Sequence, residues 1–447
     1  MLDSLLFQAQ RATQQSQWQQ AINCYLQALE QQPTNQQYEF IYLKLALLYG
    51  QQQKLEPALK YFQKTIQYNP KNPAAHSGIG QILHRFEQLE QALQHYQQAL
   101  TYNPSLDNFL LTAKTFHRLG RYQQAMLCYK EAAKINPQSA ELNFSIALIQ
   151  LLHGHYKEGW QRYEARWQLP DRGFILPVTK QPQWQGETLE NKTLLIIHEQ
   201  GFGDTIQFLR YLLLIKAQKL ILKCHAPLIS MVQTSFSHLP IDIVEPNTPI
   251  LEIYDYYVPL ASLPRLFQTQ VDSIPHNIPY LKTNSAKIQP WKTKLTTGKI
   301  NIGIVWSGNP NHVNDANRSC PLDYFLNLAQ QTDIQLYSLQ KGDVAQQLNP
   351  DMPIQDCSQQ LQDFTDTAAL IQALDLVITV DTSVAHLAGA LGQKTWIILP
   401  YVPDWRWLLN RQDSPWYPTV KLFRQIQAKD WTSVFSQLQH ELNQLIS

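Results

Sequence analysis

The chain of 447 residues has little net charge, because 36 lysine and arginine residues are balanced by 35 aspartate and glutamate residues to give +1. Proteins that bind nucleic acid or an anionic membrane surface usually carry a basic excess, so neither partner is expected. The N-terminal segment carries Asp3, soon becomes rich in glutamine and lacks the basic start and apolar run of a signal peptide. No apolar run approaches the roughly 18 residues that span a bilayer. These absences favour a cytoplasmic protein without a membrane span.

Cysteine is also scarce. The five cysteines are widely spaced and form no CxxC pair: Cys24, Cys128, Cys224, Cys320 and Cys357. Such an odd, scattered set favours reduced thiols and argues against both a disulfide framework and a zinc site. The second half of the chain also lacks a DxD pair of carboxylates. We therefore expect no catalytic metal and no cofactor.

A repeat of helical hairpins occupies the first part of the chain. Four alanines recur at intervals of 37, 34 and 33 residues: Ala21, Ala58, Ala92 and Ala125. An aromatic residue follows each alanine after four positions and a proline after twelve: Tyr25, Phe62, Tyr96 and Tyr129, and Pro33, Pro70, Pro104 and Pro137. A small residue lets two antiparallel helices approach, an aromatic ring one turn later fills the gap, and proline ends the second helix. The period therefore predicts stacked helix pairs.

These segments resemble the tetratricopeptide family. A fifth, imperfect unit has Gly159 at the small position and Tyr163 at the aromatic position. We expect residues 1–168 to form an α-solenoid of four repeats and this fifth unit, whose concave face usually binds a peptide or protein. An inert spacer or an oligomerisation surface is the alternative role.

The pattern changes after the repeats. Residues 169–191 predict a linker because they contain loop-forming residues, among them Pro170, Gly173, Pro177, Pro182 and Gly186. From residue 192 short apolar runs alternate with helical segments, and the pattern restarts at residue 293. Such alternation gives parallel sheets with right-handed crossovers. The fold class is therefore α + α/β, with two doubly wound lobes at 192–292 and 293–447 that bind ligand beyond the carboxyl ends of their strands.

The sharpest motif of the first lobe is HEQGFGDTIQFLRY, residues 198–211. Gly201 and Gly203 are candidate donor-binding residues, because they permit a tight turn from strand to helix whose N–H groups and positive helix end can face an anion. The dinucleotide fingerprint is excluded because Ile206 stands where a glycine or alanine is needed, which disfavours NAD. Asp204, in the first turn of the helix, either stabilises the helix N-terminus or acts in catalysis, and we favour catalysis.

In the second lobe, candidate donor-binding residues follow the first two strands. They are Trp306, Ser307, Gly308, Asn309 and Arg318 in one loop, and Gln340 and Lys341 in the next. The length and polarity of the first loop favour a ligand-binding role. Arg318 can supply the positive charge that a departing diphosphate needs.

Two later strand ends complete the candidate set. Asp381, Thr382 and Ser383 open a helix whose hydroxyls and N–H groups can hold a diphosphate. His386, one turn further, is either part of this site or a buried structural histidine. Asp404 and Trp405 begin an aromatic-rich loop, and its rings either stack on a base or sugar or clamp the edge of the lobe.

The motifs GFGDTIQFLRY and DTSVAHLAGALG resemble those of heptosyltransferase-type glycosyltransferases. The whole layout resembles bacterial tetratricopeptide–glycosyltransferase proteins and is similar in plan to O-linked N-acetylglucosamine transferases. The resemblance implies a two-lobed GT-B region with Asp204 as general base and Asp381, Thr382 and His386 in the donor-binding stretch. Heptosyltransferases carry a basic residue, usually lysine, in the loop after the first strand of the second lobe, and here only Arg318 offers that charge.

We therefore predict a glycosyltransferase that uses a nucleotide-diphosphate sugar as co-substrate and a protein or peptide acceptor held by the repeats. The expected reaction is a metal-independent, inverting displacement. Two alternatives are a non-catalytic repeat scaffold with nucleotide-binding lobes and a nucleotide-sugar epimerase on the same two-lobed fold.

Overall fold

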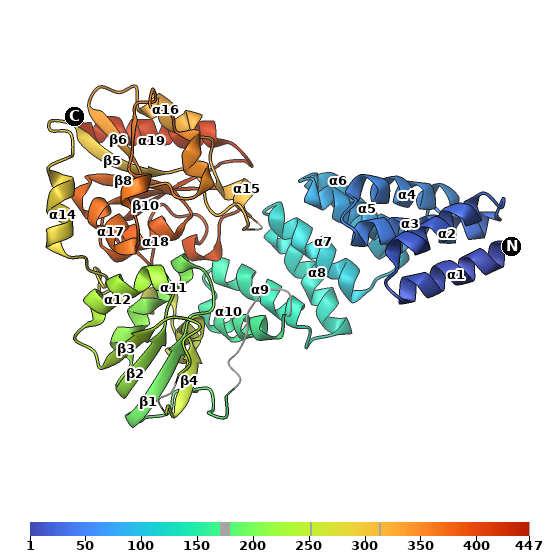
Figure 1. The fold of residues 1–447 in the computed structure, drawn as a ribbon, viewed down its shortest axis with the longest axis horizontal. Coiled ribbons are helices and arrows are strands. Elements are labelled where there is room, and N and C mark those ends of the chain that lie inside the picture. The colour runs from blue at the N-terminus through green and yellow to red at the C-terminus, as the bar shows by residue number, and fades with distance from the viewer. Residues whose placement is uncertain (170–178, 251–252, 313, 447) are drawn as a thin grey trace. The chain divides into compact units, whose positions relative to one another are not determined.

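The computed structural model describes residues 1–169, 179–250, 253–312 and 314–446. The chain forms two compact units, Met1–Ile146 and Ala147–Ser447 (Figure 1). Residues 170–178 of the predicted linker lie outside the described residues. Among those described, no helix is both long enough and apolar enough to cross a bilayer.

The first unit consists of helices that pair as successive hairpins, α1 with α2 through α7 with α8. Its helices are α1 (Leu2–Gln14), α2 (Trp18–Leu29), α3 (Asn35–Gln51), α4 (Leu55–Tyr68), α5 (Pro73–Arg85), α6 (Leu89–Tyr102), α7 (Leu106–Arg118), α8 (Tyr122–Ile135) and the start of α9 (Ala140–Leu152). Polar caps start the first helix of several hairpins. The Thr34 hydroxyl accepts from the Gln37 N–H at 3.4 Å, and the side-chain Oδ1 of Asn72 accepts from the Ala75 N–H at 2.9 Å. The prediction of helical hairpins is confirmed.

The repeating alanines and aromatic residues form the core between these helices. Each of the four alanines is completely buried, and the aromatic side chains beside them are at most 4% exposed. Two glycines of α5 show how tight the contact is. A Cβ on Gly78 would stand 2.2 Å from the Phe62 ring, and one on Gly80 would stand 2.6 Å from the Tyr96 ring. The small positions thus set the distance at which neighbouring helices pack.

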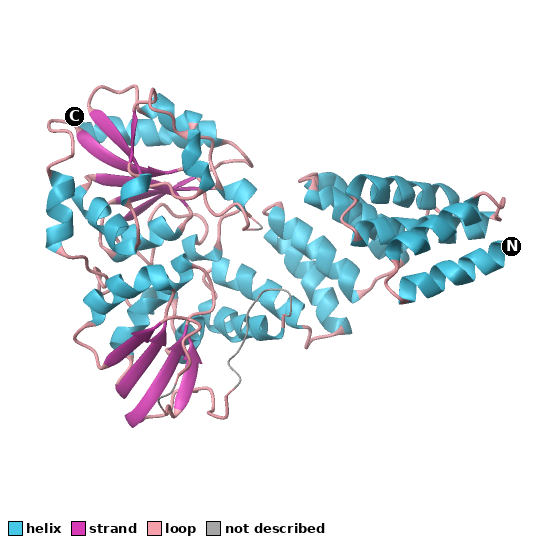
Figure 2. Cartoon of the chain, viewed as in Figure 1, coloured by secondary structure: helices cyan, strands magenta, loops and turns pink. Residues whose placement is uncertain are grey.

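The second unit contains two sheets whose strands are all parallel (Figure 2). The four-stranded sheet has the order β3-β2-β1-β4, and the six-stranded sheet has the order β10-β9-β8-β5-β6-β7. The strands are β1 (Leu189–Ile197), β2 (Ala217–Lys223), β3 (Ile241–Val244), β4 (Tyr256–Pro259), β5 (Ile300–Val305), β6 (Ile334–Ser338), β7 (Ile354–Asp356), β8 (Leu376–Val380), β9 (Thr395–Leu399) and β10 (Val420–Arg424). In the six-stranded sheet the direction of the strand order reverses between β5 and β8, as in doubly wound sheets. Ligands of such sheets bind at this switch point.

Helices lie before, between and after these strands. They are α10 (Tyr156–Tyr163), α11 (Phe202–Phe208), α12 (Ile229–Phe236), α13 (Leu263–Leu266), α14 (Ser285–Lys292), α15 (Asp315–Arg318), α16 (Asp323–Leu328), α17 (Phe364–Ala373), α18 (Ser383–Ala390) and α19 (Trp431–Ile446). Every residue of β8 and β9 is buried. Parallel strands are commonly covered on both faces, which explains why these two read as uninterrupted apolar runs in the sequence.

The end of α9, together with α10, belongs to the second unit, so the division after Ile146 differs from the predicted array of residues 1–168. The reason is the packing of α10. Its Trp160 ring meets the Trp405 ring edge-on with centroids 5.1 Å apart, and the Tyr156 hydroxyl accepts from the Trp416 indole N–H at 3.1 Å. Gly159 keeps the small-residue role predicted for it, since a Cβ there would stand 2.7 Å from Leu151. The fifth helix pair is thus a repeat-like hairpin built into the second unit.

The hairpin packing yields a stability prediction at Ala92 of α6, which is completely buried. Replacement by leucine, Ala92→Leu, should overpack the hairpin and lower the free energy of unfolding by about 1–3 kcal/mol. Gln94→Leu is the matched control, because Gln94 is exposed on the same helix. Urea unfolding of both variants measures the difference. Equal stability of the two would show that position 92 does not determine the spacing.

Candidate functional site

Two loops from different sheets meet at Asp204. This residue lies in the first turn of α11, just after β1, and its Oδ2 accepts from the Gly201 N–H at 3.0 Å. Its Oδ1 forms an ion pair with Arg406, which lies in the loop after β9. Both carboxylate oxygens are therefore engaged, while about a quarter of the side chain stays exposed. Asp204 thus stabilises its own turn, which is the structural role considered for it, and it also pairs with a loop of the second lobe. Its catalytic role stays a prediction.

Arg406 makes further contacts besides its pair with Asp204. Its guanidinium donates to the Gln207 side chain at 2.6 Å and to the Asp404 carboxylate at 2.7 Å, and the side chain is only 9% exposed. The sequence interpretation named Asp404 and Trp405 but missed Arg406 between them and the next tryptophan. The sequence did carry a signal for Arg406, because an arginine between two tryptophans is a candidate for burial. A buried arginine must be paired with a carboxylate or another acceptor.

A second arginine organises the switch point between β5 and β8. Arg318 donates to the Asp315 carboxylate at 3.1 Å and to the backbone carbonyl of Asp381 at 3.0 Å. Burial, and after it the negative charge of Asp404, raise the pKa of Asp381 to about 6 against the charges of Arg318 and Arg406. Residues from the ends of β1, β5, β8 and β9 thus form one charged cluster.

The loop after β5 is held by hydrogen bonds to side chains. The Gln340 amide accepts from the N–H groups of Trp306 and Ser307 at 3.3 and 3.1 Å and donates to the Ser307 carbonyl at 3.1 Å. The Gly308 N–H donates to the Ser319 hydroxyl at 3.1 Å, and a Cβ on Gly308 would stand 2.4 Å from Arg318. Gln340 and Gly308 therefore shape the loop through its backbone.

The other predicted residues of these loops lie apart from the cluster. The Trp306 ring is buried and donates through its indole N–H to Gln347 at 2.8 Å. Asn309 is exposed, and its side chain accepts from the Asn311 N–H at 3.0 Å. The Lys341 ammonium donates to the Ser358 carbonyl at 2.7 Å.

The predicted residues of α18 divide into two groups. Thr382 and Ser383 are partly exposed at the helix start, where no side chain caps the N–H groups. His386 is buried, and its Nδ1 lies 2.9 Å from the Tyr417 hydroxyl. Its ring stacks on Trp407 at 5.3 Å, and a Cβ on Gly203 would stand 2.8 Å from it. Gly203 and His386 therefore allow α11 and α18 to pack closely.

Trp405, a candidate donor-binding residue, has a buried ring. The ring is 4% exposed and lies among Trp160, Tyr163 and Trp416. The Arg406 guanidinium lies over the face of the Trp405 ring, 4.2 Å from the ring centroid. These contacts hold the Asp404–Arg406 loop against α10.

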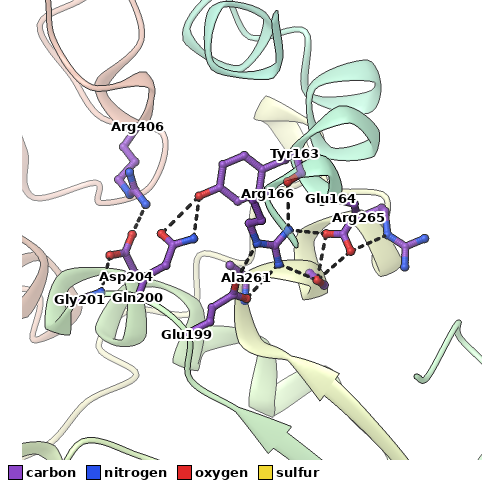
Figure 3. Close-up of polar contacts among 11 residues, drawn as sticks. Tyr163, Glu164, Arg166, Glu199, Gln200, Gly201, Asp204, Ala261, Arg265 and Arg406 are labelled. Carbon is purple, nitrogen blue, oxygen red and sulfur yellow. Dashed lines mark hydrogen bonds and ion pairs between the residues drawn. The ribbon is translucent and has the colours of Figure 1, made fainter. Parts of the chain in front are cut away.

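A buried ion network lies beside this cluster, and sequence reasoning missed it (Figure 3). Arg166 is completely buried and donates to both Glu199 carboxylate oxygens, at 2.6 and 2.9 Å, and to the Ser262 hydroxyl at 2.8 Å. It also pairs with Glu164 at 2.7 Å. Burial raises the pKa of Glu199, and the Arg166 charge opposes that effect. The network connects the segment after α10 to the end of β1.

The same figure shows a second link to the turn before Asp204. The Gln200 amide donates to the Tyr163 hydroxyl at 2.8 Å, and the Tyr163 ring lies against the Arg166 guanidinium at 4.8 Å (Figure 3). Because Gln200 precedes the glycine turn, α10 helps to position Asp204.

Among the described residues, no group of three or more histidine, cysteine, aspartate or glutamate side chains is arranged to hold a metal ion. Two surface hollows lie away from the charged cluster. One of about 380 Å³ lies on the first unit and includes His84, Tyr96 and Lys114 in its lining. Another of about 420 Å³ lies on the second unit and includes Leu152, Leu408 and Arg411.

The chain matches two protein-family models, described as "Tetratricopeptide repeat" over residues 43–107 and "TPR repeat" over residues 113–154. The N-terminal helices are tetratricopeptide repeats. The curated Protein FlbA of Caulobacter vibrioides is 26% identical over 334 residues, covering 67% of this chain. The chain spans 55% of that relative's length.

Solved structures similar to the repeats include a tetratricopeptide repeat protein from Parabacteroides merdae, with 17% identity and a TM-score of 0.35 over 38% of this chain and 67% of the other. A crystal structure of MamA matches with 18% identity and a TM-score of 0.33 over 36% of this chain and 92% of the other. A tetratricopeptide protein from Thermus thermophilus matches with 19% identity and a TM-score of 0.31 over 38% of this chain and 93% of the other.

The network beside the last repeat-like hairpin gives a second stability prediction. Arg166→Met removes the cation and leaves Glu199, whose side chain is 4% exposed, without its partner. Breaking a buried pair in this way should cost about 3–5 kcal/mol of unfolding free energy. Arg265→Met is the control, because Arg265 lies 3.9 Å from Glu164 and is 26% exposed. A partly exposed pair at this distance should contribute about 0–1 kcal/mol.

The loss in Arg166→Met should depend on pH. An acid whose pKa is raised by folding stabilises the protein below its unfolded pKa and loses that contribution as the pH rises. Without Arg166 the pKa of Glu199 rises further, so the loss should be smaller at about pH 5 than at about pH 8. Denaturant unfolding at both values tests this sign, and a loss independent of pH would contradict the role given to Glu199.

Proposed function

We propose that the protein is a glycosyltransferase that moves a sugar from a nucleotide-diphosphate sugar to an acceptor hydroxyl by inverting displacement. The observation that carries the proposal is the pairing of Asp204 with Arg406. It brings the glycine turn after β1 next to strand-end loops of the six-stranded sheet. A two-substrate transfer needs such an arrangement, because acceptor and donor must meet with their reacting atoms about 3–3.5 Å apart.

The donor side of the proposed GT-B region is the switch point between β5 and β8. The diphosphate would bind at the start of α18, where the N–H groups of Ser383 and Val384 have no side-chain cap. A helix N-terminus favours an anion there through its N–H groups and its dipole. Arg318 would contribute its remaining donors, since an arginine has five and those on Nε and Nη1 bond Asp315 and Asp381. This set stabilises the leaving diphosphate as it takes the electron pair of the broken bond.

The acceptor side is the turn that carries Asp204. The acceptor oxygen forms a bond to the anomeric carbon from the face opposite the diphosphate, and its proton must leave in the same step. We propose that the negative charge of the Asp204 carboxylate promotes this proton transfer. The tetratricopeptide repeats would bind a protein or peptide acceptor, as such arrays commonly do. We propose a cytoplasmic location. The scheme uses a nucleotide sugar as co-substrate and no cofactor or metal.

Donor binding predicts a sharp effect at Ser383, the first residue of α18. A carboxylate suits a helix N-terminus, so Ser383→Asp should retain the stability of the fold. The same charge should repel a diphosphate and weaken nucleotide-diphosphate binding at least tenfold, which is about 1.4 kcal/mol. The control is Ser285→Asp at the exposed first position of α14. Calorimetry with a panel of nucleoside diphosphates measures both, and equal affinities would remove α18 from the donor site.

Catalysis predicts a different effect at Asp204. Asp204→Asn keeps the side-chain size but removes the negative charge, so turnover should fall ~10²–10⁴-fold. Donor affinity should stay near the parent value, because the donor is proposed to bind at α18. Release of nucleoside diphosphate measures turnover. A parent protein that binds nucleotide sugars but releases no diphosphate would instead be a binding scaffold, and one that isomerises the bound sugar would be an epimerase.

A further inference from the structure

A histidine from the neighbouring strand packs on the turn that carries Asp204. His225 follows β2, and its Nε2 lies 2.8 Å from the backbone carbonyl of Gln200. Its ring centroid is 4.8 Å from that of Phe202, the residue between the two glycines of the turn. His225 therefore contacts the turn at two points, immediately before and after Gly201.

The hydrogen bond to Gln200 fixes the tautomer of His225. A carbonyl oxygen can only accept, so Nε2 must carry the proton, and in the neutral ring Nδ1 then presents a lone pair. Among the described residues, none forms a hydrogen bond to Nδ1, and the ring is partly exposed. Burial lowers the pKa of His225, while its bond to Gln200 and the negative charge of Asp204 oppose this effect. The ring is thus a neutral base within the field of a carboxylate.

Other bases near the turn are less suited to accept a proton. The Glu199 carboxylate is held by Arg166 and by the Ala261 N–H at 3.0 Å. Asp204 has one oxygen on Arg406 and the other on the Gly201 N–H. The ring of His198 lies 4.1 Å from that of His225, but its Nδ1 bonds the Lys223 carbonyl at 3.2 Å. His198 is thus bonded to the end of β2, whereas His225 contacts the turn through Gln200 and Phe202.

We infer that His225 is the general base of the transfer, an inference that rests on the proposed glycosyltransferase function. As the acceptor oxygen bonds to the anomeric carbon, its proton passes to Nδ1 of His225. The bond from that carbon to the diphosphate breaks, and the diphosphate leaves with the electron pair. Asp204 stabilises the imidazolium that forms, so it acts through His225 rather than as the proton acceptor.

The test is a double-mutant cycle in the full-length chain. His225→Gln keeps an amide that can donate to the Gln200 carbonyl but removes the basic nitrogen. Turnover should fall ~10²–10⁴-fold, the usual contribution of a positioned base. The double variant His225→Gln with Asp204→Asn should be no slower than the slower single variant, because residues that act as a unit are not additive. The control is His238→Gln, an exposed position between α12 and β3.

Two further readouts separate chemistry from folding. Donor affinity by calorimetry and the melting temperature should match the parent in His225→Gln. Added imidazole should restore part of the turnover of His225→Ala and leave that of His238→Ala unchanged.

Turnover of His225→Gln within threefold of the parent, or fully additive losses in the cycle, would overturn the inference. Either result would leave the proposed function intact. A parent protein that turns over no nucleotide sugar would instead refute the proposed function itself.

Discussion

The second unit depends on buried arginines that connect elements far apart in the sequence. Arg406 reaches from the loop after β9 to α11, where it pairs with Asp204 and bonds Gln207. Arg210 reaches the other way, from the segment after α11 to the Trp416 carbonyl at 2.9 Å. A guanidinium out of water must be satisfied by charges and carbonyls, and here those partners include groups of the opposite lobe. The positions of the two sheets are therefore linked to the chemistry of the loops between them.

The last helix pair shows how a repeat can become part of a different fold. Its hairpin retains a small residue at Gly159, as in the preceding repeats. Its aromatic residues, however, face the α/β unit: Trp160 packs on Trp405, and the Tyr163 hydroxyl meets Gln200. The Arg166 pair with Glu199 adds a buried charge contact beside them. Together these contacts explain why the compact unit begins within α9.

The proposed site combines rigid and adaptable parts. The loop after β5 is held by Gln340, and His386 is enclosed between Trp407 and Tyr417, so neither needs a ligand for its conformation. The start of α18 and the Nδ1 of His225 retain unused hydrogen-bonding capacity. Transfer chemistry benefits from this division, because preorganised dipoles stabilise developing charge without reorganising during the reaction.

The sequence by itself determined the helical hairpins and the alternation of strands and helices, because both follow from local periods of small, aromatic and apolar residues. It also placed Asp204, Ser307, Arg318, Asp381 and Asp404 in the segments that follow strands, since parallel strands present their carboxyl ends at one edge. Only the tertiary structure decided which of these side chains meet. Arg406 lies 202 positions from Asp204, and Glu199 lies 33 from Arg166. No local spacing specifies such partners, because a buried charge is satisfied by whichever group the folded chain brings beside it.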